Sequence, residues 1–203
     1  MGGKVSHTDT VPAEGVVRSA LRESIEVQTQ LLEEHVSTIA HLSRLLVGTL
    51  RAGGKLVLFG NGGSAADAQH VAAELVNRFL MDRDALAAIA LTTDTSILTS
   101  VCNDAAFDQV FSRQVRALVQ GGDVVVGVST SGNSPNVING IIAAKEKGAT
   151  TVGFTGRGGG ELKDLVDICC WVPSDSTPRI QEAHITVWHA ICEVVEKEMF
   201  GGG

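Results

Sequence analysis

The sequence predicts a single α/β domain in which helices cover both faces of a parallel sheet. Two observations predict this fold. After residue 54, five short β-rich runs alternate with segments of helical periodicity, which is typical of βαβ units. The chain has 203 residues and is 44% hydrophobic, which suffices for one full core but is short for two ordinary domains. The predicted strands are 55–59, 87–91, 123–129, 151–155 and 168–172, and the predicted helices are 64–80, 95–119 in pieces, 135–147 and 178–199.

The N-terminal part carries a long apolar stripe. Between residues 16 and 50, apolar side chains recur at helical spacing, from Val17 and Leu21 to Leu46 and Leu50. The stripe is too long for one typical helix, so we expect two helices or one bent helix as an N-terminal extension of a domain that spans 16–200. Residues 1–15 and the final glycines are rich in Gly, Ser and Thr, and we expect them to be disordered.

Composition narrows the class of function. The net charge of −7 provides no basic field for the phosphates of nucleic acid, so nucleic acid is not expected as a partner. No stretch of about 18 apolar residues and no apolar secretory signal occur, so we expect a cytoplasmic protein without a membrane partner. The four cysteines lack CxxC spacing and are expected to be reduced.

Two loops at the ends of predicted strands have the composition of a binding site. Residues 129–135 hold four hydroxyls and a glycine directly before a helix whose first turn accepts Pro135. Free backbone amides at such a helix start bind phosphate, and the absence of a lysine favours a sugar phosphate over a nucleoside triphosphate. Residues 60–64 form a second such loop. The alternative is that these residues only make caps and turns.

Two helices carry groups that could bind a metal or move protons. His70 and Glu74 stand four residues apart and share a face, which suits a zinc ion, although this spacing more often forms an ordinary surface pair. In the last helix, His189 aligns with Gln181 or Glu182, and periodicity cannot choose between them. His184 points partly away from that face. A buried core histidine with surface polar residues is the alternative.

At these residues the sequence resembles the phosphoheptose isomerase branch of the sugar isomerase (SIS) domain family. The resemblance spans about residues 16–200 in order, which is far more specific than any one motif. The matching segments are Gly60-Asn-Gly-Gly-Ser-Ala-Ala-Asp-Ala-Gln-His70, Ala90-Leu-Thr-Thr-Asp-Thr-Ser-Ile-Leu-Thr99, Cys102-Asn-Asp104, Phe111-Ser-Arg-Gln114, Ser129-Thr-Ser-Gly-Asn-Ser134, Gly153-Phe-Thr-Gly156, Gly158-Gly-Gly160 and Arg179-Ile-Gln-Glu182, with His184 and His189.

The resemblance implies a five-stranded parallel sheet in a flavodoxin-like three-layer sandwich, and a homotetramer with active sites at subunit interfaces. It implies conversion of sedoheptulose 7-phosphate to D-glycero-D-manno-heptose 7-phosphate, the first step toward the heptose of lipopolysaccharide or related glycoconjugates. It also implies one Zn²⁺ per subunit, held by His70, Glu74, Gln181 and His189. The implied substrate-binding residues are Asn61, Gly62, Gly63, Glu74, Asn103, Asp104, Ser129, Thr130, Ser131, Ser134 and Gln181.

Isomerisation moves a proton between C1 and C2 through an enediol(ate), which requires a base at carbon and proton transfer at the oxygens. We assign Glu74 as the base and His189 as the group at the oxygen end. A histidine lone pair bound to zinc cannot also accept a proton, so either the metal is loosely held or His189 serves one role at a time. Asp67 and Asp94 are candidates for supporting groups or for N-terminal helix charges.

Two other branches of the family are possible readings. A non-catalytic scaffold that binds the DnaA replication initiator has the same fold, but its members typically lack the acidic residue at the Glu74 position and the histidine at the His189 position. This sequence keeps both, which favours an enzyme. A sugar-phosphate sensor that regulates transcription would carry a helix-turn-helix domain, and the first 50 residues show no basic clustering.

Overall fold

A wholly parallel five-stranded sheet, ordered β2-β1-β3-β4-β5, forms the middle layer of the protein. The structure is a computed structural model that describes residues 12–201. The predicted sheet is confirmed, and each strand agrees with its predicted range to within one residue at either end. The strands are β1 Leu56–Gly60, β2 Ala88–Ala90, β3 Val124–Ser129, β4 Thr150–Thr155 and β5 Ile168–Trp171.

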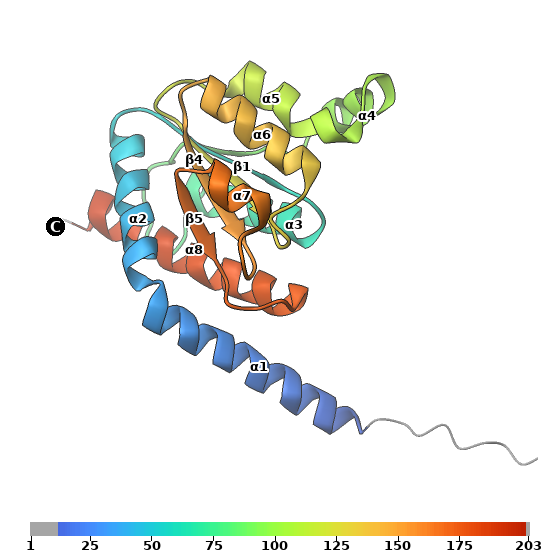
Figure 1. Cartoon of the computed structure of the whole chain (residues 1–203). Helices are drawn as coiled ribbons and strands as arrows, with labels where there is room; N and C mark the ends of the chain where they lie inside the picture. Colours follow the sequence, from blue (N-terminus) through green and yellow to red (C-terminus); the bar gives the residue numbers. More distant parts are fainter. Residues whose placement is uncertain (1–11, 202–203) are drawn as a thin grey trace, which may run out of the picture.

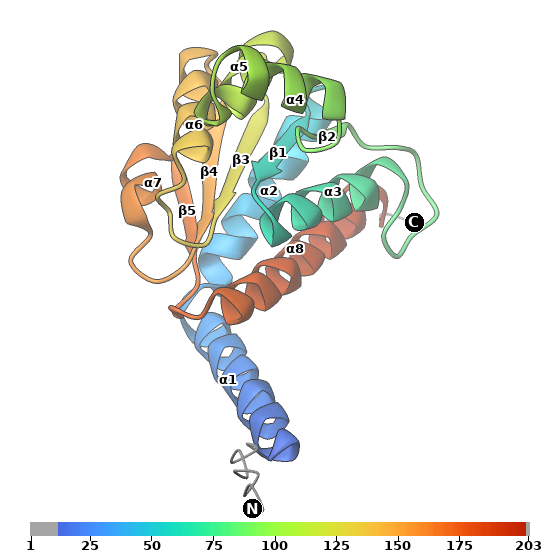
Figure 2. The same cartoon turned by 90° about the vertical axis from the view of Figure 1, so that its right-hand side faces the viewer.

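Helices cover both faces of this sheet (Figures 1 and 2). All five residues of β1 are buried, as expected for a parallel strand between two helical layers. Alternate side chains point to opposite faces, so Leu58 joins one core cluster and its neighbours Val57 and Phe59 join the other. The first layer holds α1 Ala13–Glu34, α2 Val36–Arg51, α3 Gly63–Val76 and α8 Thr177–Phe200, and the second holds α4 Thr95–Asp104, the 3-10 turn η1 Phe107–Gln109, α5 Val110–Leu118, α6 Pro135–Glu146 and α7 Gly160–Leu165.

The N-terminal extension consists of two helices, which is the first of the two forms expected, the other being one bent helix. They meet at His35, whose buried ring packs edge-on against Trp171 at a centroid distance of 4.6 Å. Helix α1 then extends away from the layers (Figures 1 and 2). It begins at Ala13, so the expected disorder over residues 1–15 is wrong for its last three residues, which are helical. Residues 1–11, 202 and 203 lie outside the described part of the chain.

Two further features differ from the sequence prediction, the end of one helix and the presence of a short one. Helix α3 ends at Val76, four residues before the predicted end at 80, because the chain turns at Asn77 into a loop that leads to β2. The short helix α7 was not predicted, since its six residues are too few to show a helical period.

The strand order places β1 and β3 side by side, while their crossovers run to opposite faces of the sheet. In parallel sheets this switch point leaves a crevice beyond the carboxyl ends of the two strands, where ligands bind. Both loops singled out in the sequence start here, after Gly60 of β1 and Ser129 of β3. Within the described residues, no helix combines the length and the apolar character that crossing a bilayer requires.

Candidate active site

The loops after β1 and β3 are joined by a pair of amides. Asn61 Nδ2 donates to Asn136 Oδ1 at 2.9 Å, and Asn136 Nδ2 donates to Asn61 Oδ1 at 2.8 Å. Asn61 directly follows β1, at the start of the loop 60–64, and Asn136 lies in the first turn of α6. The two loops therefore meet, and Asn61 is fixed at the point where they do so.

The β3 loop gathers three hydroxyls. Ser129 Oγ lies 2.9 Å from Ser134 Oγ and 3.3 Å from Ser131 Oγ. Ser134 is the residue before α6, yet its side chain makes no capping hydrogen bond to that helix. Thr130 and Ser131 line a hollow of about 270 Å³ that Arg157 also lines. Arg157 is paired there with Asp175, whose carboxylate lies 3.4 Å from its Nε and also lines the hollow. The hydroxyls of the loop are the donors that suit an anionic group.

The loop after β4 holds the β3 loop, residues 129–135, in place. Gly132 adopts φ +69°, and a Cβ there would lie 2.0 Å from the carbonyl oxygen of Gly159, so only glycine fits. Its own carbonyl accepts from the amide of Leu162 at 3.0 Å, and Asn133 Oδ1 accepts from the amide of Glu161 at 2.9 Å. The motif glycines after β4 therefore set the shape of the β3 loop.

Helices α3 and α8 bring two imidazoles together. His70 Nε2 lies 2.9 Å from His189 Nε2 and 3.4 Å from Glu74 Oε1. Only one proton can lie between the two nitrogens, so one ring donates and the other accepts. His70 is half exposed and the Glu74 side chain is 19% exposed, so the group is open to a ligand. Sequence spacing alone showed the His70–Glu74 pair, whereas the approach of His189 is a tertiary feature.

Gln181 and Gly63 are packed tightly where α8 passes the start of α3. A Cβ built on Gly63 would lie 2.4 Å from Gln181 Nε2, so the absence of a side chain at Gly63 admits the glutamine. Gly62 precedes α3 at φ +55°. Gln181 therefore lies against the β1 loop, on the same helix as His189.

The predicted residues Asn103, Asp104 and Asp94 lie at the two ends of α4. Asn103 and Asp104 are exposed at the end of α4, where Asn103 Nδ2 donates to Asp104 Oδ1 at 2.7 Å, and α4 packs in the layer opposite α3 and α8. Among the described residues, neither side chain makes a hydrogen bond to His70, Glu74 or His189. Asp94 caps α4 by accepting from the amide of Ile97 at 2.9 Å, which favours its structural role.

Two further titratable groups lie on the helices that carry the imidazole pair, the half-buried Asp67 on α3 and the buried His184 on α8. Burial raises the pKa of Asp67, although the nearby His70 opposes this, and Asp67 Oδ2 has no hydrogen-bond partner among the described residues. His184 is fully buried and its Nε2 lies 3.0 Å from the carbonyl oxygen of Thr155. His184 thus faces strand β4.

The donor types at the imidazole pair suit a divalent cation. Two imidazole nitrogens, a carboxylate and an amide oxygen are ligands that zinc accepts, and a cation would take the place of the proton between His70 and His189. Within residues 12–201, however, no three His, Cys, Asp or Glu side chains are grouped so that they could hold a metal. The zinc site stays a prediction.

Comparisons with known proteins agree with this architecture. A family model described as the SIS domain matches residues 21–156. The chain is 54% identical to phosphoheptose isomerase from Geobacter metallireducens over 184 residues, which cover 91% of this chain and 97% of that protein. It belongs to the phosphoheptose isomerase branch of the SIS family.

Further relatives of this branch support the assignment. Phosphoheptose isomerase from Sulfurimonas denitrificans is 50% identical over 189 residues, covering 92% of this chain and 97% of that protein. The solved structure of phosphoheptose isomerase from Neisseria gonorrhoeae is similar with a TM-score of 0.87 at 44% identity, covering 92% of this chain and 100% of that one. The predicted SIS fold is thereby confirmed.

Sequence reasoning missed three residues that shape the site. Asn136 pairs with Asn61, Arg157 lies beside the hydroxyl loop, and the ring of Phe79 stacks on His189 with centroids 5.4 Å apart and planes at 25°. Asn136 could have been found from its place directly after the loop and Pro135. Phe79 and Arg157 carry no local signal, because their partners are distant in sequence.

Proposed function

We propose that this protein interconverts sedoheptulose 7-phosphate and D-glycero-D-manno-heptose 7-phosphate, in the pathway that supplies heptose for lipopolysaccharide or related glycoconjugates. The convergence of His70, Glu74 and His189 beside two phosphate-type loops supports this proposal most directly. The relatives named phosphoheptose isomerase support the choice of substrate.

In this proposal, Glu74 removes the proton from the carbon next to the carbonyl and returns it to the neighbouring carbon. His189 moves the proton between the two oxygens, so that the ketone becomes a hydroxyl while the hydroxyl becomes an aldehyde. Each group ends in its starting protonation state. The contact of His70 Nε2 with both His189 and Glu74 keeps the two catalytic groups close to each other.

The phosphate of the substrate would bind at the β3 loop, where Ser129, Thr130, Ser131 and Ser134 offer hydroxyl donors. The sugar chain would then extend past Asn61, Gly62 and Gly63 toward His70. Asn61 suits this role because its pair with Asn136 holds its amide in place before a ligand arrives.

We further propose that His70, Glu74, Gln181 and His189 hold one Zn²⁺, and that His189 serves as ligand and as proton carrier one role at a time. A bound divalent cation would polarise the carbonyl and stabilise the developing oxyanion. The facing Nε2 atoms support this, since each is an atom that can bind a metal once deprotonated and the two lie only 2.9 Å apart.

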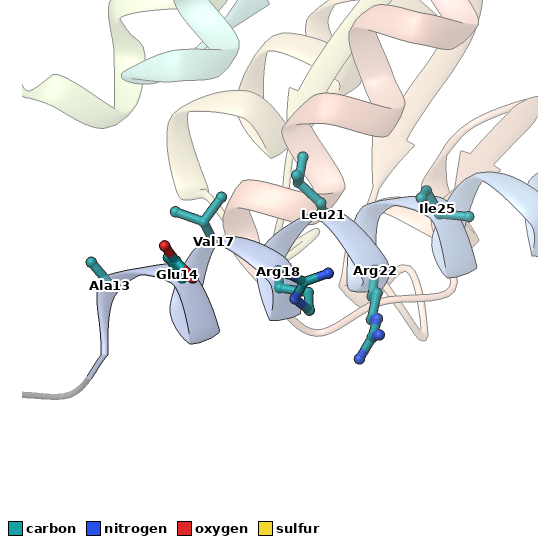
Figure 3. Close-up of a pocket in the computed structure, with 7 residues that line it drawn as sticks. All are labelled: Ala13, Glu14, Val17, Arg18, Leu21, Arg22 and Ile25. Atoms are coloured by element: carbon teal, nitrogen blue, oxygen red, sulfur yellow. The ribbon is translucent and has the colours of Figure 1, made fainter.

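We also propose a homotetramer with shared sites. In α1, Val17, Leu21 and Ile25 form an apolar row, each 58–65% exposed, beside a hollow of about 580 Å³ (Figure 3). A face of this kind is expected to be covered by another subunit. In such an assembly Asn103 and Asp104, which are exposed at the end of α4 and bonded to each other, would serve a neighbouring subunit's site.

The deciding experiment is an assay of the purified protein with sedoheptulose 7-phosphate, after metal depletion and again after zinc is restored. We expect aldoheptose phosphate to form, to cease on depletion and to return with zinc. Turnover that is unchanged after metal depletion would contradict the zinc site and leave the isomerase assignment intact. An absence of turnover in both states would contradict the proposed substrate and favour either a different sugar phosphate or the initiator-binding scaffold.

A further inference from the structure

A buried ion pair lies behind the imidazole pair, in a place that neither sequence motifs nor the proposed chemistry explain. Arg83 Nε lies 3.0 Å from Glu196 Oε1, and both side chains are only 1% exposed. Glu196 follows His189 by seven residues, or two turns, and so lies on nearly the same face of α8. The pair thus connects the loop after α3 to the helix that carries His189.

Glu196 fixes the backbone of that loop. Its Oε1 accepts from the amide of Phe79 at 2.9 Å, and its Oε2 accepts from the amides of Leu80 and Met81 at 2.8 and 2.9 Å. Burial by itself raises the pKa of Glu196, but these amides and Arg83 outweigh it and hold the pKa below the ordinary range. The carboxylate is therefore ionised and holds three consecutive amides.

Arg83 fixes the end of α3. Its Nη2 donates to the carbonyl oxygen of Glu74 at 2.7 Å, and its Nη1 donates to that of Leu75 at 2.7 Å. Because α3 ends at Val76, the last-turn carbonyls lack intrahelical donors, and a guanidinium there also suits the negative end of the helix dipole. Arg83 thereby holds the backbone of Glu74, the proposed base.

Phe79 connects this hydrogen-bond network to His189. Its amide is held by Glu196 Oε1, and its ring lies on the imidazole of His189. The network thus reaches both proposed catalytic groups, Glu74 through its carbonyl and His189 through its ring face. Replacement of a buried ion pair by apolar residues often leaves stability unchanged or raises it, so stability alone does not explain this one.

We propose that Glu196 and Arg83 are positioning residues, which act through Phe79 and the end of α3 to set His189 against Glu74 in the isomerase site. The inference rests on the proposed function. Two contacts are required for this positioning: the ring of Phe79 has to lie on His189, and the charged carboxylate of Glu196 has to hold the loop that carries Phe79.

The test uses the full-length enzyme and four variants. Phe79→Leu removes the ring but keeps the backbone amide that Glu196 binds, and Phe79→Tyr restores a ring. Glu196→Gln keeps the shape and removes the charge. Glu193→Gln is the matched control, because Glu193 is a carboxylate one turn earlier in α8 that pairs with Lys197 at the surface.

We expect Phe79→Leu and Glu196→Gln to lower kcat by about 10- to 100-fold, the cost typical of a misplaced catalytic group, with KM within about twofold because the phosphate loops are untouched. Phe79→Tyr and Glu193→Gln should keep wild-type kcat. The ring-proton NMR resonances of His189 should shift in both impaired variants, because the ring current of Phe79 is removed or displaced.

Three results would overturn the inference. The first is wild-type kcat in Phe79→Leu while the parent enzyme is active. The second is a loss that appears in KM instead of kcat. The third is an unmoved His189 resonance in folded Glu196→Gln. The NMR measurement needs no turnover, so an inactive parent enzyme would count against the proposed function while the positioning of His189 is still decided. If Glu196→Gln does not fold, the Phe79 pair decides the result.

Discussion

The Nε2 atoms of His70 and His189 lie 2.9 Å apart although 119 residues separate them in the chain. The contact depends on how α3 and α8 pack on the same face of the sheet. It places an imidazole pair one helical turn from Glu74. The predictions that follow test whether this small group performs the proposed isomerisation.

Glu74→Gln should lower kcat by about 100- to 10,000-fold, the range typical of a lost general base. The substitution keeps the volume and removes the group that accepts the proton. Substrate affinity, measured by calorimetry on the same preparation, should change little. A kcat near that of the parent enzyme would refute the assignment of Glu74.

His189→Ala should lower both turnover and bound metal, measured by mass spectrometry of the dialysed protein. The substitution removes a proposed ligand and the proposed proton carrier together. Loss of turnover at full metal occupancy would instead assign His189 to proton transfer alone. An unchanged kcat would exclude both roles.

Ser131→Ala should raise KM by about 10- to 100-fold, since a hydrogen bond to a charged group contributes roughly 1.5–3 kcal/mol. The thermal midpoint should stay close to that of the parent enzyme, because Ser131 is exposed in its loop. Ser37→Ala, an exposed helical serine in α2, is the matched control. An unchanged KM would place the phosphate elsewhere.

Acid should destabilise the fold partly through His184. Burial lowers its pKa to about 4, although its hydrogen bond to the carbonyl of Thr155 raises it somewhat. In the unfolded chain the ordinary value is about 6.5. As the pH falls, the unfolded state therefore gains a proton before the folded state does. The contribution of His184 to the free energy of unfolding is complete above pH 6.5 and is lost as the pH falls toward 4, by roughly 2 kcal/mol between pH 7 and 5.

Urea unfolding at pH 7 and pH 5 measures this loss. His184→Gln cannot be protonated and can still donate to Thr155, so its free energy of unfolding should fall less between the two pH values. An equal fall in the variant would show that other groups cause the acid sensitivity.

Leu21→Glu should dissociate the proposed tetramer while the monomer stays folded. Leu21 is 61% exposed in the single chain, so the charge costs little until another subunit covers it. Light scattering coupled to size exclusion would report the mass. Leu118→Glu, an exposed leucine in α5, is the control. An unchanged mass in Leu21→Glu would exclude α1 as the contact.

The sequence by itself determined the layers of this protein and the composition of its loops. Alternating apolar runs and helical periods predicted all five strands, because period and burial are local properties of a segment. The hydroxyl loop 129–135 and the His70–Glu74 pair were equally visible, since each lies within one turn or one loop.

The tertiary structure decided which groups meet. His189 contacts His70, Asn136 holds Asn61, and Arg83 joins Glu196. Each pair comes from elements far apart in the chain, and periodicity reports which face of a helix is buried but never which partner buries it. Side-chain packing between α3 and α8 supplies that information, and it makes a site from residues that the sequence shows only separately.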